Sequence, residues 1–289
     1  MFTKGTEINQ MEANELKKIL SELKNGERIW EAEQKVIIVE SMLEHIGSVD
    51  SELRDQLIYS LFSQLIVEKN LLEHELLTKL LDVALNDLLL RGIGEKGTDT
   101  VFTRSFTSLL IALILYRDNK DDFLDPHTIL RVKDTLINYI NLEKDLRGYV
   151  ADKGWAHSIA HVADNFDELV KSKKIHKEHY GEMLRALWDK IFVFNSVYIH
   201  EEEERILIPI LEMLERGLEI KEIEILLQKI PAVLKKQKSL IEEEEYWFLY
   251  ANCKTFLKSF LIKVQKNPKL HSLQKSIENC LKSDWNLLA

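Results

Sequence analysis

Glycine and proline are scarce in this chain, and their scarcity limits the folds that it can adopt. Only ten glycines and four prolines occur among 289 residues, whereas average usage would give about 12% of the chain. A β-sandwich or barrel needs a turn about every 8–12 residues, and turns use these two residues because glycine adopts positive φ and proline fixes φ. The composition therefore excludes such β folds, as well as collagen-like and low-complexity chains, and it favours helices.

Apolar residues recur with the helical period along almost the whole sequence. The periodic segments are residues 11–24, 29–45, 50–68, 71–90, 99–117, 126–143, 154–172, 176–195, 201–216, 219–238 and 240–266, with a last one from 268. Asp125-Pro126 and Asn267-Pro268 each place a capping side chain before a proline at the first helical position. The sequence thus predicts an all-α protein of about eleven or twelve helices, since few other residues remain between them.

Most connections between these segments are short, which predicts antiparallel helical hairpins. Pairs of segments recur about every 40–45 residues, the length of HEAT and armadillo units. We therefore expect hairpins stacked as a HEAT/armadillo-like α-α superhelix, with a compact helical bundle as the alternative. Residues 1–46 are expected to form N-terminal helices, 47–195 a central region with the candidate site, and 196–289 C-terminal helices, all within one continuous α-helical domain.

Charge and hydropathy limit the compartment and the partners. The formal net charge is −9, which argues against a nucleic-acid backbone as the partner. No apolar segment reaches the roughly 20 residues that span a bilayer, and the N-terminal residues lack the apolar core of a secretory signal. Cys253 and Cys280 show no metal-ligand spacing. We expect a cytoplasmic protein that binds neither nucleic acid nor membrane.

Two connections are longer than the others, at residues 91–98 and 144–153. Five of the ten glycines lie in or beside them, at positions 92, 94, 97, 148 and 154. Loops on a rigid scaffold often carry function. Gly92 to Gly97 has the form GxGxxG, but a helical segment precedes it, so a dinucleotide site is not predicted. Binding of an anion by the loop amides and a plain helix-ending connection are both open, and the second is the simpler interpretation.

Histidines and carboxylates lie on one stripe of the segment predicted as helix 154–172. At about 100° per residue, His157, His161 and Asp164 face one side, while Trp155 and the apolar residues face the other. Ligands at i, i+4 and i+7 could hold a divalent metal and leave a coordination position open. Alternatively, Asp164 could orient His161 as a general base. A solvated polar face of an amphipathic helix is the third interpretation.

Arg104 lies in an apolar segment, 99–117, that should be central in the fold. A buried arginine requires an acidic partner or an anionic ligand, because an unpaired buried charge is costly. A structural ion pair is favoured over a ligand clamp. Arg147 and Tyr149, in the second long connection, directly precede the histidine segment and would neighbour any site there.

The segments GIGEKGTDTVFTRSF (92–106) and LRGYVADKGWAHSIAHVADNFDEL (146–169) resemble a bacterial family known as domain of unknown function 2785. The resemblance extends from about Gly47 into the 190s. It implies an all-helical, bacterial, cytoplasmic protein and brings no established activity. It gives added weight to the positions that match the family's motifs, namely Arg104, Arg147, Tyr149, Trp155, His157, His161 and Asp164.

Three functions are consistent with these residues. The leading hypothesis is a helical-repeat protein with a polar pocket that binds a small anionic molecule or a segment of a partner protein. There, arginines would supply charge, Tyr149 and Trp155 an amphipathic wall, and the histidines and Asp164 directed hydrogen bonds. The alternative is a metal-dependent hydrolase or lyase with His157, His161 and Asp164 as ligands. The second alternative is a protein-interaction scaffold without a small-molecule site. Whether the protein is an enzyme, and whether it binds a metal, is left open by the sequence.

Overall fold

A computed structural model describes residues 11–30 and 32–283, and in these residues the protein is all-α. They form twelve α-helices, several short 3₁₀ and π segments, and a single two-stranded sheet. The predicted fold class is therefore confirmed, whereas stacking of the hairpins into a superhelix stays a prediction. The chain divides into two compact units: residues 1–124 with 143–158, and residues 125–142 with 159–289.

The first unit contains the N-terminal helices, the central helix and the sheet. Its elements are α1 (Ala13–Asn25), α2 (Ala32–Glu44), η1 (Glu52–Tyr59), α3 (Ser60–Ser63), η2 (Gln64–Glu68), α4 (His74–Val83), η3 (Ala84–Leu88), α5 (Thr100–Asp121), β1 (Tyr149–Val150) and β2 (Gly154–Trp155). The predicted helices at 50–68 and 71–90 are thus present as continuous helical segments in which α and π hydrogen bonding alternate.

Helix α5 is the core of the first unit. It packs against α3, α4 and the three π segments. It is also the one helix among the described residues that is long and apolar enough to cross a membrane, but 78% of its apolar window is buried inside the protein. Burial of this extent is what the core helix of a globular unit shows. Gly47 allows the chain to approach it closely, because a Cβ there would lie 2.7 Å from the Cα of Thr103.

The predicted helix 154–172 begins four residues late, at Ser158. Gly154 and Trp155 instead form β2, which pairs antiparallel with β1 in the register Tyr149↔Trp155 and Val150↔Gly154. Gly154 has a φ of 77° and His157 a φ of 52°, and neither value is compatible with a right-handed helix. These two residues turn the chain out of the hairpin and fix where α7 starts.

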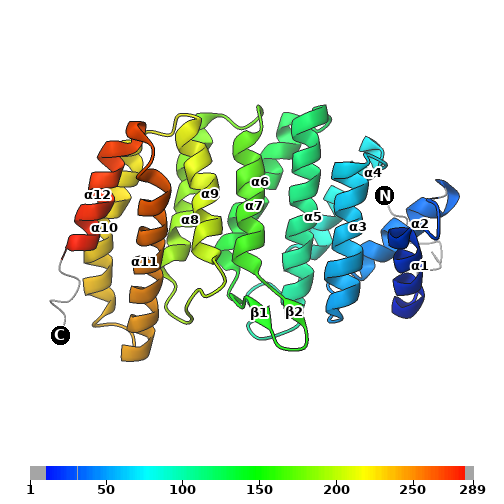
Figure 1. Ribbon diagram of the computed structural model, residues 1–289, viewed down its shortest axis with the longest axis horizontal. Helices are drawn as coiled ribbons and strands as arrows, with labels where there is room; N and C mark the ends of the chain where they lie inside the picture. The colour runs from blue at the N-terminus through cyan, green and yellow to red at the C-terminus, as the bar shows by residue number, and fades with distance from the viewer. Residues whose placement is uncertain (1–10, 31, 284–289) are drawn as a thin grey trace. The chain divides into compact units, whose positions relative to one another are not determined.

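The second unit consists of helices that pack on elements near to them in the chain. Its elements are α6 (Pro126–Leu142), α7 (Ser158–Lys171, from Ile159), η4 (Lys177–His179), α8 (Tyr180–Trp188), η5 (Asp189–Phe192), α9 (Glu202–Glu215), α10 (Ile220–Gln237), α11 (Glu243–Val264), η6 (Pro268–Leu270) and α12 (His271–Lys282). Helix α6 packs on α8, α9 on α11 and α10 on α12. Helices α10, α11 and α12 lie side by side (Figure 1) and contact one another. The predicted cap of α6 is confirmed, since Oδ1 of Asp125 accepts a hydrogen bond from the Thr128 N–H at 3.0 Å.

Candidate functional site

Arg104 forms a fully buried ion pair, as the sequence favoured. Its side chain is 0% exposed, and its Nε and Nη2 donate to the two carboxylate oxygens of Glu143 at 2.7 and 2.9 Å. Its Nη1 donates to the backbone carbonyls of Arg91 and Gly92, each at 2.9 Å. This bidentate, saturated geometry is that of a structural arginine. In this conformation Arg104 offers no surface to a ligand.

Glu143 also binds the backbone of the two residues that follow it. Its Oε1 also accepts hydrogen bonds from the backbone N–H groups of Lys144 and Asp145, at 3.0 and 2.9 Å. The carboxylate therefore turns the chain sharply at the end of α6. The ion pair of Arg104 and Glu143 ties this turn to the loop that begins at Arg91.

A second arginine joins the two long connections. Asp145 is fully buried and receives Nε and Nη2 of Arg147 at 2.8 and 2.7 Å. The same carboxylate accepts the N–H of Gly97 at 2.8 Å, and Nη2 of Arg147 donates to the carbonyl of Thr98 at 2.6 Å. An amide of the glycine loop thus binds a carboxylate of the protein itself. Arg147 keeps a side chain that is 32% exposed, and its Nη1 makes no hydrogen bond to the described residues.

A third arginine, Arg54 in η1, supports the hairpin from beneath and was not predicted from the sequence. It is 0% exposed, and its guanidinium carbon lies 4.2 Å from the ring centre of Phe102 and 4.7 Å from that of Phe106. Its Nη2 donates to the carbonyl of Lys153 at 2.6 Å, and its Nη1 to that of Ser48 at 2.6 Å. Arg54 therefore makes cation–π contacts with helix α5 and a hydrogen bond to the hairpin backbone at the same time.

Asp55 supplies the opposite charge beside Arg54. Its Oδ1 lies 2.7 Å from Nε of Arg54, as a close ion pair rather than an aligned hydrogen bond. The carboxylate also accepts the backbone N–H of Trp155, while burial raises the pKa of Asp55 above its ordinary value. Gly154 packs directly on these residues, since a Cβ there would lie 2.8 Å from the Cβ of Ser51 and 3.1 Å from Nη2 of Arg54.

Three aromatic rings form a row on the outer face of the hairpin. The Tyr149 and Trp155 rings meet edge to face with centres 5.2 Å apart, and the Trp155 and His157 rings stack with centres 4.9 Å apart. Tyr149 is 56% exposed and Trp155 39% exposed, and His157 is half-buried. The backbone N–H of His157 donates to the Arg147 carbonyl at 2.9 Å. Four of the seven predicted residues, Arg147, Tyr149, Trp155 and His157, are thus brought together, and we call this set the hairpin surface.

Of the three remaining predicted residues, Arg104 forms the buried ion pair described above, and His161 and Asp164 lie in the second unit. His161 is 8% exposed, and Asp164 forms a bidentate ion pair with Arg205 of α9, which includes an Nε–Oδ1 distance of 3.1 Å. His157 has a left-handed backbone and precedes α7, so the predicted helical stripe of His157, His161 and Asp164 is wrong at its first position. Within residues 11–30 and 32–283, no group of three or more His, Cys, Asp or Glu side chains is arranged to hold a metal ion.

A family model described as protein of unknown function (DUF2785) matches residues 89–262. The chain belongs to this family. The match begins later than the resemblance that the sequence motifs suggested and extends further, to residue 262 near the end of α11. It includes Arg104, Glu143, Asp145 and the whole hairpin surface, but not Arg54 or Asp55. No curated protein and no solved structure matches the chain.

Proposed function

We propose that this protein is a binding protein whose hairpin surface recognises an acidic segment of a partner protein. The observation that carries the proposal is the exposed row of Tyr149, Trp155 and His157 on a hairpin held in place by Arg54, Arg104 and Arg147. The proposal includes the expectation of a cytoplasmic, helical-repeat protein. It retains one branch of the leading sequence hypothesis, a partner segment, and assigns no role to His161 and Asp164.

Backbone strain supports a role for the shape of the hairpin. Asp152 and His157 have φ values of 62° and 52°, and a left-handed conformation costs a non-glycine residue about 1 kcal/mol or more. Such conformations persist where the surrounding structure holds them, and they are concentrated at binding sites and active sites. Here the arginine contacts to the carbonyl of Lys153 and around Asp145 are what hold the strained hairpin.

The chemistry of the hairpin surface suits a peptide with both apolar and acidic groups. Tyrosine and tryptophan are enriched at protein interfaces because they combine a large apolar ring with a polar atom. Arg147 keeps Nη1 available beside this row and brings a permanent positive charge to it. A carboxylate next to an apolar side chain would therefore complement the surface better than a basic segment.

A peptide selection tests this function. Random peptides displayed on phage are selected on the full-length protein and counter-selected on the Tyr149→Ala/Trp155→Ala variant. We expect enriched peptides to carry Asp or Glu next to an apolar residue and to lose at least about tenfold in affinity on that variant, since interface aromatics carry much of the binding energy. Trp247→Ala is the matched control, because Trp247 is 53% exposed in the second unit. The proposal fails if selection yields no peptide whose binding depends on Tyr149 and Trp155.

A further inference from the structure

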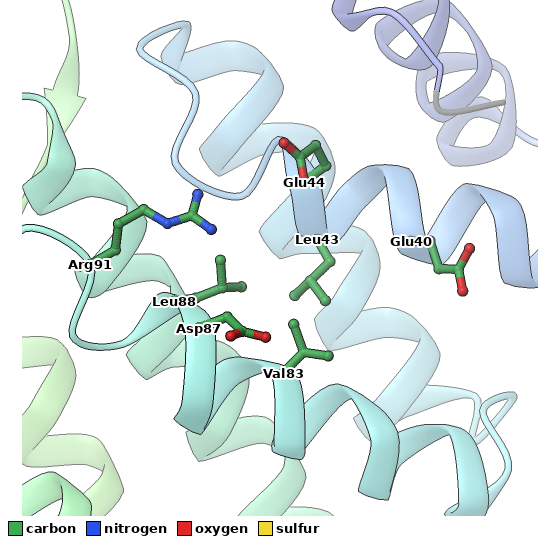
Figure 2. A pocket seen from close by; sticks show the side chains of 7 residues that line it. All are labelled: Glu40, Leu43, Glu44, Val83, Asp87, Leu88 and Arg91. Atoms are coloured by element: carbon green, nitrogen blue, oxygen red, sulfur yellow. The ribbon is translucent and has the colours of Figure 1, made fainter. Parts of the chain in front are cut away.

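A cavity of about 380 Å³ opens between α2 and the end of the α4–η3 helix, which is within the size range of small-molecule sites. Its apolar side chains are Leu43, Val83 and Leu88, and Figure 2 shows these between charged groups that come from both helices. Leu43 and Leu88 are 6% and 4% exposed, so they form a fixed apolar floor. This cavity lies in the first unit and shares no residue with the hairpin surface.

Charged side chains of both signs surround this floor. Glu40 and Glu44 come from α2, Asp87 from η3, and Arg91 from the turn that follows it (Figure 2). None of the four forms an ion pair with a described residue, although ion pairs are common elsewhere on this surface. The desolvated carboxyl of Glu40 has a raised pKa, in agreement with the absence of a nearby cation.

Arg91 is held at its backbone while its side chain extends toward the cavity. Its carbonyl accepts Nη1 of the buried Arg104, and its N–H donates to the carbonyl of Leu88 at 3.0 Å. Figure 2 shows the guanidinium directed toward the space between Glu44 and Asp87. A single cation is thus presented at one side of an otherwise acidic cavity, from a fixed point of the fold.

We propose that this cavity binds a small aliphatic zwitterion of the amino-acid class. Its ammonium group would contact Asp87, its carboxylate would contact Arg91, and its hydrocarbon part would cover Leu43, Val83 and Leu88. A simple anion would be repelled by the three carboxylates that line the cavity, and a polycation would be repelled by Arg91. Each of these ligands therefore complements only some of the charged groups around the cavity. A molecule with one charge of each sign joined by an apolar chain complements all of it.

Three probes of equal chain length separate these charge classes: 6-aminohexanoate, hexylamine and hexanoate. Isothermal titration with the full-length protein at low salt measures each affinity. We expect 6-aminohexanoate to bind about tenfold more tightly than hexylamine, the effect of one additional charge-assisted contact, and hexanoate to bind most weakly. The proposal is overturned if hexylamine or hexanoate binds as tightly as the zwitterion, or if no probe binds.

Substitutions at exposed positions assign the two ends of the probe. Arg91→Gln should abolish the advantage of 6-aminohexanoate over hexylamine, whereas Asp87→Asn should weaken both amines about tenfold. Glu75→Gln removes a carboxylate from the exposed face of α4, outside the cavity, and should change neither. Equal losses with Glu75→Gln and Asp87→Asn would overturn the assignment, and far-UV circular dichroism verifies that each variant is folded. Trp155→Ala should leave probe binding unchanged, which separates this site from the hairpin surface.

Discussion

The buried pair of Arg104 and Glu143 gives the sharpest quantitative test of the fold around the hairpin. Substitution of Arg104 by methionine removes both bonds to Glu143 and leaves a carboxylate that is 0% exposed without the guanidinium that neutralises it, although the N–H groups of Lys144 and Asp145 still donate to it. Substitution of Glu143 by leucine leaves a buried guanidinium that keeps its contacts to the carbonyls of Arg91 and Gly92. In each case one charge remains buried without its counter-charge.

The expected cost follows from that uncompensated charge. Removal of one partner of a buried ion pair lowers the free energy of unfolding by about 3–5 kcal/mol, whereas replacement of both by apolar side chains is often nearly neutral. The Arg104→Met/Glu143→Leu double variant still leaves backbone groups of Arg91, Gly92, Lys144 and Asp145 without side-chain partners, so it should recover only part of the loss. We expect the two substitutions to be non-additive by at least about 2 kcal/mol.

The double-mutant cycle is measured by urea unfolding, with hydrogen exchange as a local probe. Because the chain has two compact units, a global transition need not be two-state. Exchange of the Lys144 and Asp145 amides, which donate to Glu143, reports the pair directly. The exposed pair of Lys79 and Glu75 at 2.7 Å is the matched control and should show a much smaller coupling, because water screens it. A coupling equally small at Arg104 and Glu143 would refute the reasoning.

Three further perturbations follow from burial and packing. Burial raises the pKa of Glu203, so the folded state disfavours the ionised carboxylate. The Glu203→Gln variant should therefore have the same free energy of unfolding as the parent well below the ordinary pKa of 4.5, and should become more stable than the parent by about 1 kcal/mol as pH rises through the raised pKa. A variant that is less stable than the parent at neutral pH would contradict this. Burial raises the pKa of Cys280 to about 11, so a thiol-specific disulfide reagent at about pH 8 should label it only after unfolding, and labelling of the native protein would be the contrary result. Gly47→Ala places a Cβ 2.7 Å from the Cα of Thr103 and should lower the free energy of unfolding by about 1–3 kcal/mol, measured by thermal or urea unfolding. Gly181→Ala is the control, because its Cβ would have ordinary contacts at 3.5 Å and should not destabilise the protein. Equal effects of the two substitutions would argue against the packing explanation.

Local sequence signals predicted what depends on local interactions. Few glycines and prolines together with a helical apolar period were sufficient for the all-α class, because helices are formed by hydrogen bonds between near neighbours. The start of α6 followed from Asp125-Pro126, since a capping side chain and a proline at the first helical position act within a single turn. The need of Arg104 for a partner followed from the apolar character of α5 alone.

The hairpin could not be predicted in the same way. Gly154 and Trp155 fit the helical period that continues into α7, and a two-residue strand has no periodicity of its own. The hairpin backbone that takes the place of a first helical turn is held by Arg54, which contacts the carbonyl of Lys153 from 99 residues away in the sequence. Because that contact is made only in the folded chain, the stripe of His157, His161 and Asp164 was drawn on a helix that begins too late to include His157.

The anchoring of the hairpin by arginines has a further consequence for its role. Buried ion pairs seldom maximise stability, because apolar residues of similar volume avoid the cost of desolvating charge. Yet Arg54, Arg104 and Asp145 are all fully buried, and each contacts backbone groups of the two long connections. Directed bonds to carbonyls and amides fix where a segment lies, which apolar contacts do less specifically. We infer that these side chains maintain the shape of an exposed surface rather than add to the stability of the core.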